Sequence, residues 1–211
     1  MMRKMQIVAY LGAVSAALFA HTNASAIEAD VAVDAEFRQA ITLSVSQTID
    51  FTPGGRSLEY TDVTNITGVT DYVSIATNGA MSNPGGSRLT TGYATGNRGE
   101  LAFTGEDASV SISCNTNTRL SESGGVDLLL TNAELDVAAT IGAVGAALGA
   151  GDYDCAGLGT TPYTYVITGN AGVIAAGGRL EGVANMPSGL YSSTNVAEGG
   201  IPMTVRVVYG P

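Results

Sequence analysis

Apolar and polar residues alternate along the chain from Ile27 onward. A period of two puts neighbouring side chains on opposite faces, as in a β-strand with one buried face. The odd positions form an apolar face: Ile27, Ala29, Val31, Val33, Ala35 and Phe37. The even positions form a mainly charged face: Glu28, Asp30, Ala32, Asp34, Glu36 and Arg38. We therefore predict an extended arm over residues 27–38.

Similar short segments follow, separated by glycine, proline and asparagine. The alternation continues through Ile41, Leu43 and Val45, and further strands are predicted at 49–51, 72–77, 100–104, 108–114, 126–131, 163–168, 179–184 and 203–209. Residues 105–107 read as a short hairpin connection, and residues 177–178 as a turn before a strand. Strands of this number and spacing indicate an all-β, Ig-like sandwich. The Ala/Gly-rich segment 134–151 is an exception, and we expect an excursion with one short helical stretch.

Residues 1–26 have the pattern of a secretory signal peptide. Arg3 and Lys4 precede an apolar run over residues 7–20, and Ala24-Ser25-Ala26 forms a small-x-small cleavage site. The apolar run is too short for a permanent membrane span, so no stable membrane insertion is expected. Removal of the signal leaves 185 residues, which we divide into the arm, 27–38, and a single sandwich domain, 39–211.

The composition after residue 26 excludes several chemistries. This part of the chain has no histidine, lysine or tryptophan, and its seven arginines face 19 acidic residues, a net charge of −12. Without histidine there is no Ser–His–Asp triad and no imidazole-bound metal. Without lysine there is no Schiff base and no phosphate-loop lysine. The negative charge argues against nucleic acid and anionic membranes as partners. We predict no enzyme, no cofactor and no metal site.

Two cysteines, Cys114 and Cys155, remain after the signal. In an exported protein, a single pair of cysteines typically forms a disulfide. Two free thiols or a two-cysteine metal site are the alternatives, and a metal site without histidine would be poor.

The arm has two possible roles that the sequence leaves open. It can pair in cis, as the first strand of its own sheet. It can also pair in trans, filling a groove on a neighbouring sandwich that lacks one strand, with its odd side chains as plugs. The cis arrangement is the usual one, but the position directly after the cleavage site strengthens the trans interpretation, so the sequence leaves the two about even. Contacts of this kind are head to tail and repeat into a filament.

Several motifs resemble a bacterial secreted β-sandwich family of unknown function, similar to spore-coat-U-like proteins and chaperone–usher pilin subunits. The motifs are Ala40-Ile41-Thr42-Leu43 with Ile49-Asp50-Phe51, then Gly99–Gly105 with Ala108–Ile112. The closing part has Gly177-Gly178-Arg179-Leu180, Gly189-Leu190-Tyr191-Ser192 and Met203–Tyr209. The resemblance covers roughly residues 40–209 and implies no catalytic residues. It implies that the strand of Met203, Val205, Val207 and Tyr209 forms one groove edge and contacts an assembly chaperone.

The sequence thus predicts a structural subunit of a cell-surface fimbria or coat. The subunit would polymerise head to tail with copies of itself after export through the periplasm, helped by a periplasmic chaperone and an outer-membrane usher. One alternative is a monomeric secreted module that binds carbohydrate or a surface. A second alternative, a hydrolase with two carboxylates, is disfavoured because residues 27–211 hold no tryptophan and only three phenylalanines to line a cleft.

Overall fold

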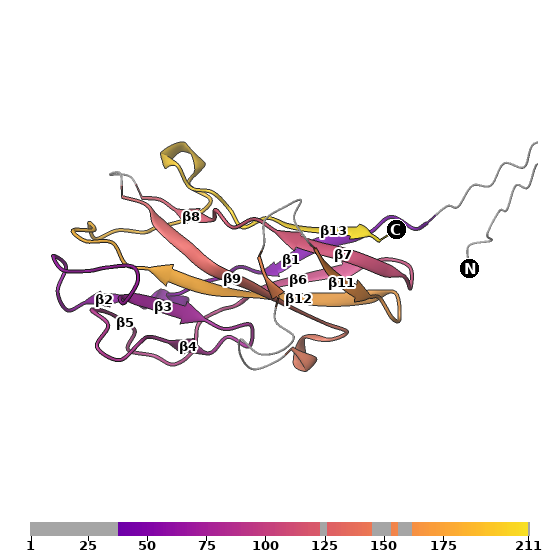
Figure 1. The fold of residues 1–211 in the computed structure, drawn as a ribbon, viewed down its shortest axis with the longest axis horizontal. Helices are drawn as coiled ribbons and strands as arrows, with labels where there is room; N and C mark the ends of the chain where they lie inside the picture. The colour runs from indigo at the N-terminus through magenta and orange to yellow at the C-terminus, as the bar shows by residue number, and fades with distance from the viewer. Residues whose placement is uncertain (1–37, 123–125, 145–152, 156–161, 211) are drawn as a thin grey trace, which may run out of the picture. The chain divides into compact units, whose positions relative to one another are not determined.

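The computed structural model describes residues 38–122, 126–144, 153–155 and 162–210 (Figure 1). The chain divides into two units between Gln39 and Ala40, and nearly all of the described residues lie in the second unit, Ala40–Pro211. The strands all belong to the second unit: β1 (Thr42–Gln47), β2 (Glu59–Tyr60), β3 (Tyr72–Ile75), β4 (Met81–Ser82), β5 (Leu89–Thr90), β6 (Gly99–Thr104), β7 (Ser109–Cys114), β8 (Arg119–Leu120), β9 (Leu128–Ala138), β10 (Tyr153–Asp154), β11 (Tyr163–Val166), β12 (Ala171–Glu181) and β13 (Val205–Tyr209). The helical pieces are single 3-10 turns: η1 (Pro53–Gly55), η2 (Ile141–Ala143) and η3 (Val196–Glu198). The predicted all-β class is confirmed for this unit.

Strand β12 organises an eight-stranded antiparallel sheet. One edge of β12 pairs with β9, and the other edge pairs first with β6 and then with β3. Strand β1 pairs with β6, β4 pairs with β3, and the short β8 and β10 both pair with β9. Strand β12 is thus covered on both edges. Most of its residues are buried.

A three-stranded antiparallel sheet, in the order β11-β7-β13, forms the second layer. Phe103 and Ile174 of the large sheet share one apolar core with Val110 and Ile112 of the small sheet, and each is at most 1 % exposed. The ring of Phe103 meets the ring of Tyr165 in β11 edge to face, with centroids 6.2 Å apart. The two sheets therefore enclose one core, as in a β-sandwich.

The predicted hairpin at residues 105–107 is wrong. Strands β6 and β7 follow one another in the chain, but they belong to different sheets. Their inner side chains, such as Phe103 and Val110, contribute to the same core from opposite layers. Residues 105–107 therefore carry the chain from one layer to the other. The alternation of side chains is the same in both arrangements, so the pattern could not distinguish them.

The predicted turn at residues 177–178 is also wrong, because both glycines lie inside β12. A Cβ atom on Gly177 would collide with the carbonyl oxygen of Ile75, and one on Gly178 would lie 3.0 Å from Cδ1 of Leu130. The pairing of β12 with β9 shifts register between Gly177 and Arg179. Glycine is needed here for close strand packing at a bulge, and the chain does not turn.

The excursion predicted at residues 134–151 begins later than expected. Strand β9 continues through Ala138, and Leu135 within it is fully buried. Only the 3-10 turn η2 follows, in place of a longer helical stretch, and residues 145–151 lie outside the described residues. The predicted strand 49–51 is reduced to an isolated bridge at Asp50.

The predicted disulfide between Cys114 and Cys155 is confirmed. Cys114 ends β7 in the small sheet, and Cys155 directly follows β10 in the large sheet. The amide of Cys155 also donates a hydrogen bond to the carbonyl of Ala133 in β9, with the atoms 2.8 Å apart. The bond therefore ties the two layers together and fits an oxidising compartment.

Replacing both cysteines with alanine should lower the free energy of unfolding by about 4 kcal/mol, because the bond closes a loop across 41 positions. Urea titration of the oxidised protein and the Cys114→Ala/Cys155→Ala variant measures the difference. A reducing agent should destabilise the wild type to a similar extent and leave the variant unchanged. A loss below about 1 kcal/mol would contradict this role.

A buried carboxylate, Asp71, holds two loops together. It accepts hydrogen bonds from the amides of Arg88 and Thr67, with donor–acceptor distances of 2.6 and 2.8 Å. The Arg88 guanidinium lies 3.4 Å from the same carboxylate. These interactions, the Arg88 amide first, lower the pKa of Asp71 although burial opposes them. The ionised form is therefore the one the fold stabilises.

Acid should destabilise the protein through Asp71. Its folded pKa lies below the unfolded value of about 4, so the stabilisation is complete above that pH and is lost as the pH falls through the folded pKa. Asp71→Asn should lower the melting temperature at pH 7 and reduce its dependence on pH below about 4. Thermal melts from pH 7 to pH 2 measure this, with the exposed Glu59→Gln as control. An unchanged acid limb in Asp71→Asn would contradict the assignment.

Candidate functional site

The inner face of β1 is only partly covered. Leu43 pairs with Phe103 and Val45 pairs with Leu101, so these side chains share the face that looks into the core. Phe103 is 1 % exposed, whereas Leu43 is 38 % and Val45 65 % exposed. Apolar side chains on the core side of a sheet are normally covered by the opposite layer. Here the opposite layer ends before it reaches β1.

In the other layer, the inner face of β13 is also only partly covered. Val205, Val207 and Tyr209 pair with Cys114, Ile112 and Val110 of β7, which are fully buried. The three β13 side chains remain partly exposed although they point to the same side. On the outer face of β13, the side chains of Arg206 and Val208 are exposed.

A groove lies between the end of β1 and the segment that leads into β13. It has a volume of about 450 Å³. We call it the β1/β13 groove, and its main lining residues are Val45, Ile49, Phe51, Leu101, Leu120, Leu130, Ala176, Met203 and Val205. The hydroxyl-bearing residues 191–194 also line it. Its floor is thus the uncovered flank of the core.

Strands β1 and β13 run in opposite directions (Figure 1). At one end, a Cβ atom on Gly105 would lie 2.8 Å from the Tyr209 hydroxyl and 3.4 Å from Cγ1 of Ile41. The start of β1 and the end of β13 are therefore close there. The Tyr209 hydroxyl accepts a hydrogen bond from the Glu106 amide at 2.8 Å, which fixes this end. At the other end, Ile49 follows β1, Met203 precedes β13, and both line the groove.

Both edges offer backbone groups to a further strand. Among the described strands, β1 pairs only with β6 and β13 pairs only with β7. A strand placed between them would add main-chain hydrogen bonds on both sides and side chains above the apolar floor. This combination of open edges and uncovered core is the feature we assign as the candidate site.

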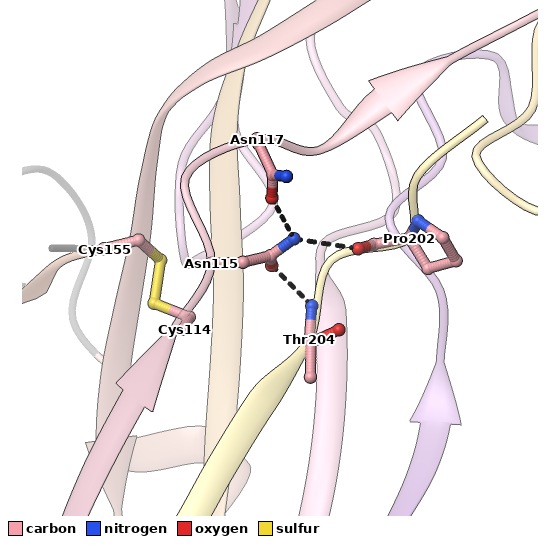
Figure 2. The surroundings of a disulfide bond; sticks show 6 residues. All are labelled: Cys114, Asn115, Asn117, Cys155, Pro202 and Thr204. Carbon is pink, nitrogen blue, oxygen red and sulfur yellow. Dashed lines mark hydrogen bonds between the residues drawn. A yellow bond between two sulfur atoms is a disulfide. The ribbon is translucent and has the colours of Figure 1, made fainter. Parts of the chain in front are cut away.

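The side chain of Asn115 fixes the start of β13 next to the disulfide (Figure 2). Its amide nitrogen donates to the carbonyl of Pro202 at 3.0 Å and to the side-chain oxygen of Asn117 at 2.9 Å. Its oxygen accepts from the Thr204 amide at 2.6 Å. Asn115 directly follows Cys114, so the covalent link between the layers and the wall of the groove are held by adjacent residues.

The sequence predicted one wall of this site and missed the other. Val205, Val207 and Tyr209 lie on the inner face of an edge strand, and Met203 lines the groove just before it. The six predicted plug residues, from Ile27 to Phe37, lie outside the described residues. The strand of Leu43 and Val45 was predicted, but nothing in its alternation marks it as a sheet edge.

No other chemical site competes with the groove in the described ranges. They contain no cluster of three or more acidic, cysteine or histidine residues that could hold a metal, and no helix long and apolar enough to cross a membrane. Asp107, one of the loop acids, accepts a hydrogen bond from the Asn170 amide at 2.6 Å and thereby stabilises its turn. No protein-family model, curated protein or solved structure matches this chain.

Removal of the Asn115 side chain should loosen the groove wall. Asn115→Ala deletes three hydrogen bonds, whereas Asn117→Ala, the matched control, deletes only the one between the two side chains. We expect a loss of about 1–2 kcal/mol in unfolding free energy for Asn115→Ala and less than half of that for the control. Amide hydrogen exchange should rise at Thr204–Val207 in Asn115→Ala only. Equal effects of the two variants would contradict the anchoring role.

Proposed function

We propose that this chain is a structural subunit that polymerises at the cell surface. Residues 27–38 of one copy would occupy the β1/β13 groove of the next copy. The observation that supports the proposal is the uncovered core flank between two open strand edges, including Leu43 and Val45. No catalytic residue, metal or cofactor is needed for this function.

The arm matches the groove in pattern. Its odd side chains are all apolar, and its even side chains are mainly charged. Inserted between β1 and β13, it would direct the odd set to the floor and leave the even set in water. Each large member, such as Val33 or Phe37, would contribute about 1.5–3 kcal/mol if fully buried.

The geometry of such an assembly is head to tail. The arm of one subunit and the groove of the next are different surfaces, so each contact leaves a new arm or groove available and the chain of contacts can grow. Before assembly the groove would expose apolar side chains and two strand edges, which favour aggregation. A periplasmic chaperone that covers β13 and an outer-membrane usher are the partners we propose for this stage.

A second candidate is a monomeric secreted module that binds carbohydrate. It is favoured by the hydroxyl-bearing residues 191–194 at one side of the groove. However, Ser192 and Thr194 bond to each other at 2.8 Å, and the Tyr191 hydroxyl donates to the carbonyl of Pro187 at 3.0 Å. These groups are engaged within their own loop, so we prefer the polymer.

One buried charge in the arm should abolish assembly. Val33→Asp would place an unpaired carboxylate on the apolar floor, at a cost of several kcal/mol. The matched control Ala32→Asp adds the same charge one position away, on the face that stays in water. We expect filaments by electron microscopy, and large species by gel filtration, for the wild type and the control only.

The outcome separates the two candidates. Filaments formed by Val33→Asp would argue against insertion through the odd face. A wild-type protein that is monomeric at all concentrations, with or without added chaperone, would reject the polymer and favour the binding module.

A further inference from the structure

Arg206 is a cation in an unusual place. It lies at the centre of β13, which borders the β1/β13 groove, and its exposed side chain points to the outer face. It pairs with Ser113 of β7, and the next outward residue, Val208, pairs with Ser111. Thr164 and Val166 of β11 lie on the same face, farther from the groove. The outer face of this sheet therefore presents no acidic residue to Arg206 within its described strands.

The other exposed or half-exposed arginines of the second unit are engaged. Arg88, Arg98, Arg119 and Arg179 each form an ion pair, and Arg56 lies over the ring of Tyr93. No ion pair of Arg206 is found among the described residues. In a chain with so few cations, an arginine on the open edge of the groove indicates an acidic partner outside this sheet.

The arm has the complementary charge. Its even face carries four acids: Glu28, Asp30, Asp34 and Glu36. If the odd face points to the floor of the groove, the even face lies on the same side of the sheet as Arg206. Opposite charges facing each other across neighbouring strands stabilise the pairing, and like charges oppose it.

The inner face selects one register. When the arm runs antiparallel to β13 with Val33 opposite Val207, Phe37 falls opposite Met203, which lines the groove. The largest side chain of the arm is then placed at the groove's apolar lining. In the parallel arrangement, with Ala32 still opposite Val208, Phe37 would extend beyond the end of β13.

In this register Asp34 lies opposite Arg206, and Ala32, the uncharged member of the even face, lies opposite Val208. In this register the apolar face of the arm meets the apolar groove, and its charged face meets Arg206. We propose that the cross-strand pair between Arg206 of one subunit and Asp34 of the next sets the register of the inserted arm. This inference rests on the proposed function and adds to it the residues that specify the contact.

A charge-reversal cycle on the full-length mature protein tests the pair. Arg206→Glu and Asp34→Arg should each weaken assembly about three- to tenfold at low salt, since an exposed attraction becomes a repulsion. The double variant should return to within about twofold of the wild type. The differences should shrink in 0.5 M salt. Light scattering against protein concentration measures assembly, and thermal melts verify folding of each variant.

Control variants decide between this pair and its rivals. Asp30→Arg is the matched control, because Asp30 faces Gly210 in the proposed register and faces Arg206 in the parallel arrangement with Ala32 opposite Val208. Rescue of Arg206→Glu by Asp30→Arg in place of Asp34→Arg would overturn the proposed register. Arg206→Ala tests the alternative that Arg206 protects the open edge of β13 against edge-to-edge aggregation. Stronger association of that variant would overturn the pairing, whereas two- to fivefold weaker association is expected.

The two proposals fail in different ways. If the wild type assembles and Arg206→Glu assembles equally well at low salt, the ion pair is wrong and the polymer stands. If the wild type never assembles, the polymer is wrong and the pairing falls with it.

Discussion

The structure depends on how the core between the two sheets is closed at its sides. Along β12 the closure is complete, because β9 covers one edge and β6 and β3 cover the other. Between β1 and β13 it is incomplete, because each strand ends its own sheet and the two do not pair with each other. The apolar floor of the β1/β13 groove is the direct consequence, since side chains that point inward there have no opposite layer.

A disulfide and several hydrogen bonds hold the strands at this open side in place. The Cys114–Cys155 bond joins the layers at the end of β7, and Asn115 holds the segment that leads into β13. At the opposite end, the hydrogen bond from the Glu106 amide to Tyr209 fixes the last residue of β13. An edge strand with a neighbour on one side only would otherwise fray, so these contacts hold both ends of β13 in place.

Many of the strands could be predicted from the local sequence pattern, but the way in which they pair could not. Alternation identified β1, β7 and β13, because a strand with one buried face carries apolar and polar side chains in turn. The pairing of strands depends on residues far apart in the chain, so β6 and β7 looked like a hairpin. Gly177 misled for a related reason: a glycine needed for close packing and one needed for a turn look alike in sequence. The disulfide was predictable because only two cysteines remained to pair.

The candidate site, too, could be predicted from the sequence only in part. Val205 and Val207 were assigned to a groove edge from a resemblance, and the structure places both on the inner face of β13. The opposite wall, at Leu43 and Val45, becomes visible only when their exposure is set beside the burial of Phe103. The sequence contains the complementary pattern in residues 27–38, with an apolar and an acidic face. Neither the pattern nor the groove specifies a partner alone. Together they support the proposal that the partner is an extended segment with apolar residues at every second position and acidic residues between them.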